Sequence, residues 1–153
     1  MSQTIEDIHS GLISALTGDA GITGWVTTHF GAGAALSTIK ANAPVDKIDV
    51  NKLPALIMEI GDSNPEVEVQ GNLQLVPHDI PFAFVWIEQT GADAWTQRLQ
   101  LHDLVIKCLL ANPSLGVAGA GAWVSEVQSD HNAFHPKHVM RFVVSTEFHV
   151  EAA

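Results

Sequence analysis

Apolar residues recur with the period of a helix near the start of the chain. Between about Ile5 and Thr17 they fall on one stripe, which favours an amphipathic helix; these residues are Ile5, Ile8, Leu12 and Leu16. Thr4 precedes the stripe as a candidate N-cap, with Asp7 at the third helical position as the acidic partner of a capping box. Gly18 is expected to end this helix in a left-handed conformation.

A less regular region follows this helix. A second helical turn is predicted from Gly21 to Thr28, with Trp25 as its apolar anchor. From Gly31 to Lys52 the sequence is rich in Gly, Ala, Pro and Asp and shows no period. A structureless segment of that length is uncommon in a small domain, so we expect it to be either a packed irregular loop or mobile.

Two segments in the centre of the chain show the pattern of strands. Leu53 to Ile60 is predicted as a strand with three apolar side chains on one face, namely Leu56, Met58 and Ile60. Ile80 to Gln89 is apolar on both faces, which predicts a strand in the interior of a sheet. Pro81 lacks a backbone N–H and removes one ladder hydrogen bond, so we expect it near the start of that strand.

A hairpin is predicted between these two strands, from Glu66 to Pro77. A short alternating strand from Glu66 to Val69 is followed by the turn Gln70-Gly71-Asn72 and by a second strand from Leu73 to Val76. A two-stranded ribbon alone is only marginally stable in water, so its apolar residues need a partner surface. We predict that the hairpin reaches a neighbouring subunit through Val67, Val69, Leu73 and Leu75.

A long helix is predicted from about Ala92 to Ala111. Thr90 is its candidate cap, and Asp93 in the first turn lies near the positive end of the helix dipole. Asn112-Pro113 is expected to end the helix. Its expected buried side contains Trp95, Leu99, Leu104, Val105, Cys108 and Leu109. The tryptophans on apolar stripes are expected in the core, and they are Trp25, Trp86 and Trp95.

The C-terminal part has the pattern of a β-hairpin. Trp123 to Gln128 and Val139 to Glu151 are predicted strands, joined by the polar connection SDHNAFHPKH. Apolar and polar residues alternate along the second strand, which is typical of a sheet with one dry and one wet face. A strand this long would expose its backbone at a sheet edge, so we expect a neighbouring subunit to pair with it or cover it.

The order helix, strands, helix, strands predicts a single α+β domain over residues 1–153. We expect a mainly antiparallel sheet, because sequential strands are most easily joined as antiparallel neighbours. The N-terminal helix and the long helix are expected on one face of this sheet, and the long helix is expected to cover the face with Phe142 and Phe148. The strands expected in the sheet are Leu53–Ile60, Ile80–Gln89, Trp123–Gln128 and Val139–Glu151.

Charge and composition disfavour several classes of function. The 153 residues are 46% hydrophobic, and 17 Asp and Glu against 7 Lys and Arg give a formal net charge of −10. This balance argues against a general nucleic-acid binder and against attachment to an anionic membrane, because both need clustered cations. The N-terminus lacks the pattern of a signal peptide, and no apolar run is long enough for a membrane helix. A soluble protein made in the cytosol is therefore expected.

One candidate metal site lies in the last connection. His131, His135 and His138 occur close together beside Asp130, and three histidines are a known arrangement for catalytic zinc. No HExxH motif is present, however, and Pro136 directly follows His135. A polar hairpin tip without metal is therefore the favoured interpretation, and we predict that these histidines are not catalytic.

No other pattern in the chain points to catalysis. Cys108 is the only cysteine, which excludes an intrachain disulfide and a thiolate zinc site. Neither a GxSxG motif nor a phosphate-binding glycine pattern occurs. We therefore predict no catalytic, cofactor-binding or metal-binding residue, no cofactor and no enzyme activity. A small metal-dependent enzyme that uses the His131 loop is the alternative.

The layout of the whole chain resembles that of a known family. A short amphipathic helix ends in LTGDAGITGWVTTHFG, and a loop leads into LPALIMEIGDS. A hairpin precedes IPFAFVWIEQT, which runs directly into the helix DAWTQRLQLHDLVIKCLLA, and the chain closes with a two-strand unit ending in VMRFVVSTEFHVEA. From Thr4 to Glu151 this order is similar to that of the tail-terminator, or tail-completion, proteins of long-tailed bacteriophages.

The resemblance implies an α+β protomer that assembles as a ring, usually a hexamer, on the last layer of tail-tube protein. Such a ring stops tube polymerisation, fixes tail length and offers the surface to which the head connector attaches. The expected partners are further copies of this chain, the tube protein and the connector protein. The expected location is the head-proximal end of the virion tail, after assembly in the host cytoplasm.

The resemblance also implies that DNA passes through the lumen of the ring without specific binding. The acidic balance of the chain fits this role, because a lumen that repels phosphate lets DNA slide without adhering. Ordinary solubility explains the same charge. No residue role of the family maps onto this chain, and another neck or tail component, such as a tube or head-closure protein, is the alternative function.

Overall fold

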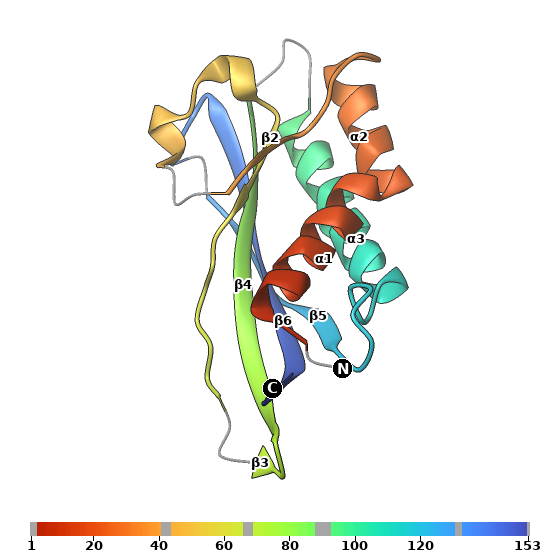
Figure 1. Cartoon of the computed structure of the whole chain (residues 1–153). Helices are drawn as coiled ribbons and strands as arrows, with labels where there is room; N and C mark the ends of the chain where they lie inside the picture. The colour runs from red at the N-terminus through yellow and green to blue at the C-terminus, as the bar shows by residue number, and fades with distance from the viewer. Residues whose placement is uncertain (1–2, 41–43, 66–68, 88–92, 131–132, 153) are drawn as a thin grey trace.

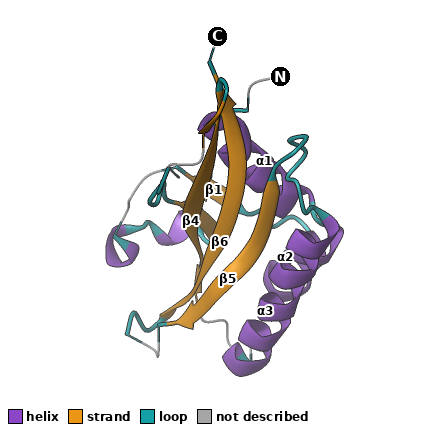
Figure 2. Ribbon diagram, turned by 90° about the horizontal axis from the view of Figure 1, so that it is seen from below, coloured by secondary structure: helices purple, strands orange, loops and turns teal. Residues whose placement is uncertain are grey.

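Three helices cover one face of a β-sheet in the computed structural model, which describes residues 3–40, 44–65, 69–87, 93–130 and 133–152. The fold is α+β, as predicted. The helices lie together on one side of the sheet, and two short helical turns lie on its other side (Figure 2). The bounds of the helices are α1 Ile5–Gly18, α2 Ala20–Phe30 and α3 Ala94–Ala111.

The sheet is mixed, with one parallel pair among antiparallel ones. Its six strands follow the order β1-β2-β4-β6-β5, with the short β3 paired to β4 off this path. Only β1 and β2 are parallel among the described pairs, so the prediction of a mainly antiparallel sheet is confirmed. The strand bounds are β1 Ser37–Ile39, β2 Ala55–Met58, β3 Val69–Gln70, β4 Leu73–Ile87, β5 Gly121–Ser129 and β6 Lys137–Glu151.

The two long strands β4 and β6 form the spine of the molecule (Figure 1). They pair along their full length, from Leu73 opposite Glu151 to Ile87 opposite Lys137. Because β5 pairs with the other side of β6, the expectation that this strand could lie at a sheet edge is wrong. The described edges are β1 and β5.

The predicted strands 73–76 and 80–89 belong to one strand, β4, which runs from Leu73 to Ile87; positions 88–89 of the prediction lie outside the described residues. Pro81 therefore lies in the middle of a strand and not near its start. The carbonyl oxygens of Pro77 and Pro81 accept hydrogen bonds from the backbone N–H groups of Asn64 and Glu59. In an antiparallel ladder the N–H and C=O of a residue point to the same neighbour. The side of Pro77 and Pro81 that lacks an N–H group therefore faces residues 59–64. The hydrogen bonds between β4 and β6 do not involve this side and are kept.

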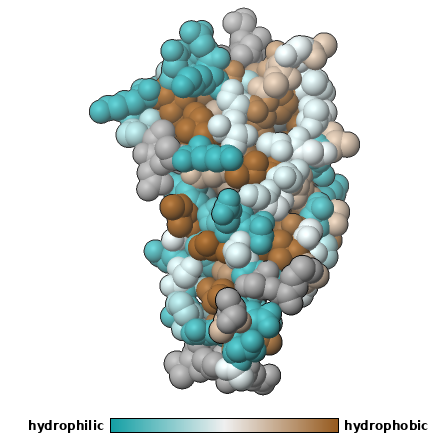
Figure 3. Space-filling model, in the orientation of Figure 1, coloured by the Kyte–Doolittle hydropathy of each residue, from teal (hydrophilic) through white to brown (hydrophobic). Residues whose placement is uncertain are grey.

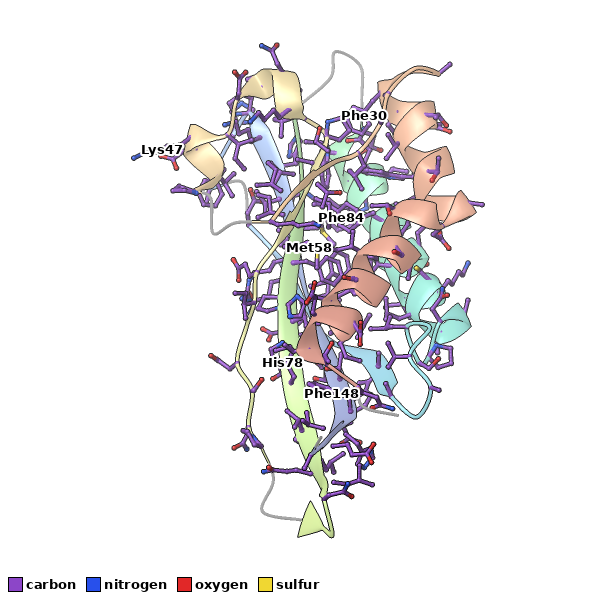
Figure 4. The ribbon with its side chains drawn as sticks, viewed as in Figure 1. Phe30, Lys47, Met58, His78, Phe84 and Phe148 are labelled. Atoms are coloured by element: carbon purple, nitrogen blue, oxygen red, sulfur yellow. The ribbon has the colours of Figure 1, made fainter. Side chains whose placement is uncertain are left out.

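The core lies between the helices and the spine. Phe142 on β6 stacks on Phe82 of β4, with ring centroids 5.4 Å apart, and meets Phe84 edge to face. Ile8, Leu12 and Leu16 of α1 are fully buried against this layer, as the helical stripe predicts. The face with Phe142 and Phe148 is shared by the helices, since Phe148 lies next to α1 (Figure 4). The long helix therefore covers only part of it.

The stretch 31–52, predicted to have no regular structure, contains the strand β1 and two short packed turns among its described residues. After β1, the chain forms the short 3₁₀ turns η1 Val45–Lys47 and η2 Val50–Lys52 on the face opposite the helices. Ile48 joins a small second core with Ile57, Val85 and Val139. The ammonium of Lys137 donates to the carbonyl oxygens of Val45 (2.9 Å), Asp46 (3.4 Å) and Ile48 (2.8 Å). These bonds fix η1 and Ile48, which follows it, to β6.

Two helix ends differ from the sequence predictions. Gly18 is not a left-handed stop, because α1 runs through it and Asp19 separates α1 from α2. The Asp19 carboxylate accepts a hydrogen bond from the Ile22 N–H (2.9 Å) and so caps α2. Asp93, and not Thr90, is the N-cap of α3, where it accepts from the Thr96 N–H (3.2 Å). Thr4 caps α1 through the Asp7 N–H, as predicted.

Outside α3, three apolar residues of the predicted stripes and alternating strands are exposed. Ile60 is 72% exposed because β2 ends at Met58 and the alternation ends with it. Ile5 lies in the first turn of α1, and Val150 lies near the end of β6, where both are exposed. None of the described helices is long and apolar enough to cross a membrane.

Candidate subunit interface

The tip of the β3–β4 hairpin and the end of β6 form a ribbon, defined here as residues 69–75 and 149–151. This ribbon extends beyond the end of α1 (Figure 1). Leu73 is 37% exposed and pairs with Glu151, while Leu75 is half-buried and pairs with His149. Val69 in β3 pairs with Gln74 in β4, and Val67 lies outside the described residues. The interface predicted for this hairpin therefore stays a prediction.

The part of the molecule that carries the ribbon is strongly acidic. The described residues 61–65, 69–80 and 144–152 contain four Asp and Glu residues and no Lys or Arg. The hydroxyl of Ser145 donates to the carboxylate of the exposed Asp79 (2.9 Å). Hydrophilic residues dominate this end of the molecule in Figure 3. Such a surface repels phosphate and favours neutral or basic partners.

Replacing both Leu73 and Leu75 by Ser is expected to weaken assembly and to leave the helical circular dichroism signal intact. The reason is that Leu73 and Leu75 lie on the ribbon, outside the main core. Sedimentation at matched concentrations measures assembly. Phe148→Ser is the control, because Phe148 is 2% exposed and its loss should unfold the protein. Loss of helical signal in the double variant would show that the two leucines belong to the core.

Helix α3 carries two apolar stripes, and only one of them is buried. The stripe in the core consists of Gln97, Leu101, Val105, Cys108 and Leu109. The other faces outward and includes Trp95, Leu99 and Leu110, which are 73%, 54% and 74% exposed. The prediction that Trp95 and Leu99 are buried is therefore wrong, whereas Trp25 and Trp86 are in the core as predicted. A helix with apolar residues on two sides and one sheet to cover it has one side left for a partner.

Two hollows lie along the boundary between α3 and β5. The larger has a volume of about 660 Å³ and is lined by Trp95, Arg98, Leu99, His102, Val127 and Met140, among others. The smaller, of about 210 Å³, is lined by Ile106, Leu110, Pro113, Trp123 and Val124, among others. We call the outward stripe of α3 together with these hollows the α3–β5 face. The sequence pattern does not point to Trp123 or Leu110 as residues of a site.

The backbone of β5 is poorly suited to receive another strand. Its Ala122 N–H donates to the Pro113 carbonyl (2.8 Å), so this donor is already used. A bulge between Val124 and Glu126 shifts the register with β6, and the Ser125 hydroxyl donates to the Val143 carbonyl (3.2 Å). Bulges and charges at an edge discourage strand addition. A partner at this face would therefore be bound through side chains.

An ion pair holds the first half of α3 to the C-terminal hairpin beneath the larger hollow. The Arg98 guanidinium lies 2.7 Å from the Asp130 carboxylate and 3.2 Å from Nδ1 of His138, and it also donates to the Ser129 hydroxyl. Asp130 is almost completely buried, and the His138 ring packs on Trp86 at a centroid distance of 5.7 Å. Arg98 is thus a structural cation whose charge is already paired.

The described histidines of the last connection do not share a site. His135 is exposed in the turn before β6, whereas His138 is buried under α3 beside the Arg98 guanidinium. His131 lies outside the described residues. Among the residues that the structure describes, no group of three or more His, Cys, Asp and Glu could hold a metal ion. A guanidinium next to His138 also opposes a second cation there.

Two other histidines, to which no sequence motif points, join α1 to β4. His9 of α1 and the buried His78 of β4 lie with their Nε2 atoms 3.0 Å apart, and the Ser63 hydroxyl lies 2.6 Å from Nδ1 of His78. Burial lowers the pKa of both imidazoles, and for His9 the neighbouring His78 lowers the pKa further. Such a contact needs at least one neutral ring, because two imidazolium ions would repel each other.

Stability is expected to fall as the pH drops below 6.5, the ordinary pKa of histidine. Because the folded-state pKa values are lowered, the unfolded chain binds protons before the folded chain does, and acid therefore favours unfolding. Urea titrations across the range from neutral to mildly acidic pH measure this loss. His9→Gln removes one titrating ring, so its free energy of unfolding should depend less on pH than that of the unmodified protein. Equal dependence in both proteins would contradict this role.

No family model matches the chain, and no curated protein matches it. The layout that resembles tail terminators and the surfaces described above therefore carry the functional proposal.

Proposed function

We propose that the chain is a structural virion protein at the head-proximal end of a phage tail. In this role, copies of the chain form a ring that caps the tail tube, ends its polymerisation and joins it to the head connector. The observation that carries the proposal is the α3–β5 face, where large apolar side chains stand exposed beside an edge strand. Exposed apolar patches of this kind mark interaction sites. The α+β fold with helices on one sheet face agrees with the layout of the family that the chain resembles.

The arrangement of the edges supports a head-to-tail ring. The sheet is bordered by β1 on one side and by β5 on the other, and these two edge strands carry different side chains. A contact that joins one end of a protomer to the opposite end of the next is heterologous, and such contacts close into rings when the rotation allows it. We propose six copies, the usual number in the family that the chain resembles.

The acidic end of the molecule supports a place beside a DNA channel. Residues 61–80 and 144–152 lack Lys and Arg, so nothing in them neutralises phosphate. DNA would pass such a surface without adhering. In this proposal the protein has no enzyme activity, and its partners are the tube protein, the connector and further copies of the chain.

Deleting the gene from a phage that encodes this chain tests the function. Electron microscopy is expected to show tails of abnormal length that do not join heads, because nothing ends tube growth or offers the connector surface. Supplying the unmodified protein in trans should restore joined particles. Tails of normal length joined to heads would overturn the terminator proposal and favour a neck or accessory role.

A further inference from the structure

We propose that a pair of histidines and a serine form a latch, which holds residues 59–64 on β4 and opens when the two imidazoles together bind a second proton. The members of this latch are His9 of α1, His78 of β4 and Ser63 of the segment between β2 and β3. His78 lies on β4 beside α1 (Figure 4). The latch is a conformational device of the chain itself and does not depend on the proposed function.

The geometry of the pair places one proton between the two imidazoles. Their Nε2 atoms are 3.0 Å apart, and their ring centroids are 5.2 Å apart. The difference is about the width of one ring, so the two nitrogens point at each other and not at a common third atom such as a metal ion. This is the arrangement of an N–H···N hydrogen bond, in which one Nε2 donates and the other accepts.

A first added proton leaves this hydrogen bond in place. Two neutral imidazoles carry two protons on four nitrogens, so one proton lies between the Nε2 atoms and the other is on the Nδ1 of the accepting ring. The first added proton therefore binds the remaining bare Nδ1. The Ser63 hydroxyl lies 2.6 Å from Nδ1 of His78 and serves either form, because a hydroxyl can donate to a bare nitrogen or accept from a protonated one.

A second added proton finds no such place. The only nitrogen left is the accepting Nε2, and its protonation turns two donors and two positive charges toward each other. Burial lowers the pKa of both imidazoles, and the neighbouring His78 lowers the pKa of His9 further. The two rings titrate as one coupled pair, and the pair binds its second proton only when the rings separate.

The charges around the pair do not remove this conflict. The charged residues on α1 and next to the latch on the other two elements are exposed carboxylates, namely Glu6, Asp7, Asp62 and Asp79. Asp62 and Asp79 raise the pKa of His78, but burial outweighs them and the pKa is lowered on balance. Glu59 pairs with Arg141 of β6 (3.7 Å). From β6 the uncharged Thr146 lies opposite His78 and donates to its carbonyl oxygen.

The segment 59–64 is the part of the structure that yields when the rings separate. It runs beside β4 (Figure 1), and its side chains are mostly exposed. Backbone hydrogen bonds hold it there, and they run from Glu59 and Asn64 to β4 and from Asp79 to the segment. Helix α1 instead keeps its buried apolar stripe. Segments with few buried contacts open locally while the rest of a protein stays folded.

Hydrogen exchange followed by NMR on the full chain tests the latch. The reporters are the amides whose hydrogen bonds join the segment to β4, which belong to Glu59, Asn64 and Asp79. The Phe82 amide in the ladder of β4 and β6 is the reference. After correction for the intrinsic effect of pH on exchange, acidification from about pH 7.5 to about pH 5 should lower the protection of the reporters at least about tenfold more than that of Phe82.

Two variants should change this pH dependence in opposite directions. His9→Gln keeps a side chain that forms hydrogen bonds but does not titrate, so the reporters should lose less than about threefold relative to Phe82. Ser63→Ala removes the acceptor of the proton on Nδ1 of His78, so the first proton already strains the latch and the loss should exceed that of the unmodified protein. His135→Gln is the control, because His135 is exposed in the turn before β6.

Three results would overturn the inference. Equal losses of protection at the reporters and at Phe82 would show that acid unfolds the whole protein without a separate latch. Constant protection of the reporters would show that the pair binds its second proton without opening. A loss in His9→Gln as large as in the unmodified protein would assign the effect to another group. If His9→Gln does not fold, Ser63→Ala decides alone, because a serine with only a structural role would lower protection equally at neutral and acidic pH.

Discussion

Gly61→Ala is expected to lower the free energy of unfolding by more than about 2 kcal/mol, because it combines backbone strain with a steric clash. Gly61 has a φ of +75°, a left-handed conformation that alanine adopts only at a cost. A Cβ atom there would also overlap the carbonyl oxygen of Asp79 on β4. Relief would require residues 59–64 to move away from β4, with loss of the hydrogen bonds from Glu59 and Asn64 to the two prolines.

Gly71→Ala is the matched control for this prediction. Gly71 in the hairpin turn has a φ of +62°, and a Cβ atom there would have no neighbour within 4 Å. Its substitution should cost only the backbone term, roughly 1–2 kcal/mol. Urea denaturation of both variants measures the difference between them. Equal losses would show that residues 59–64 yield without cost and that Gly61 does not hold them against β4.

The parts of the fold that follow from local pattern could be predicted from the sequence. The stripe of Ile8, Leu12 and Leu16 and the alternation of β6 place the core correctly, because they depend only on the periods of a helix and a strand. The continuity of β4 could not be predicted. Whether Pro77 and Pro81 interrupt a strand depends on which neighbour their missing N–H groups face, and that is a property of the folded sheet.

The candidate site was predicted less well, for a similar reason. Helix α3 has two apolar stripes, and its sequence does not say which of them the sheet covers. The prediction that Trp95 and Leu99 are buried left no exposed apolar stripe on this helix, so the α3–β5 face was not predicted. The signal that could have found it is the number of apolar residues on α3, which exceeds what one sheet face can bury. The closeness of His9 and His78 could not be predicted at all, because 69 positions separate them in sequence.

Trp86→Ala is expected to lower the free energy of unfolding, whereas Trp95→Ala is expected to weaken association and leave the free energy of unfolding nearly unchanged. Trp86 is fully buried, packs edge to face on Trp25 and donates its indole N–H to the Gln97 side chain (3.1 Å). Removing it leaves a large cavity and an unsatisfied amide oxygen, so Trp86→Ala should cost about 3–5 kcal/mol of unfolding free energy.

Trp95→Ala should change the free energy of unfolding by no more than about 0.5 kcal/mol, because the side chain is mostly exposed. The same substitution should weaken association strongly, since an aromatic side chain at the centre of an interface contributes far more than its neighbours. Urea denaturation and sedimentation velocity on the same two variants give both quantities. A large loss of stability in Trp95→Ala would place this residue in the core after all. Unchanged stability together with unchanged association would instead show that the outward stripe of α3 has no partner, and the observation that carries the proposed function would be lost.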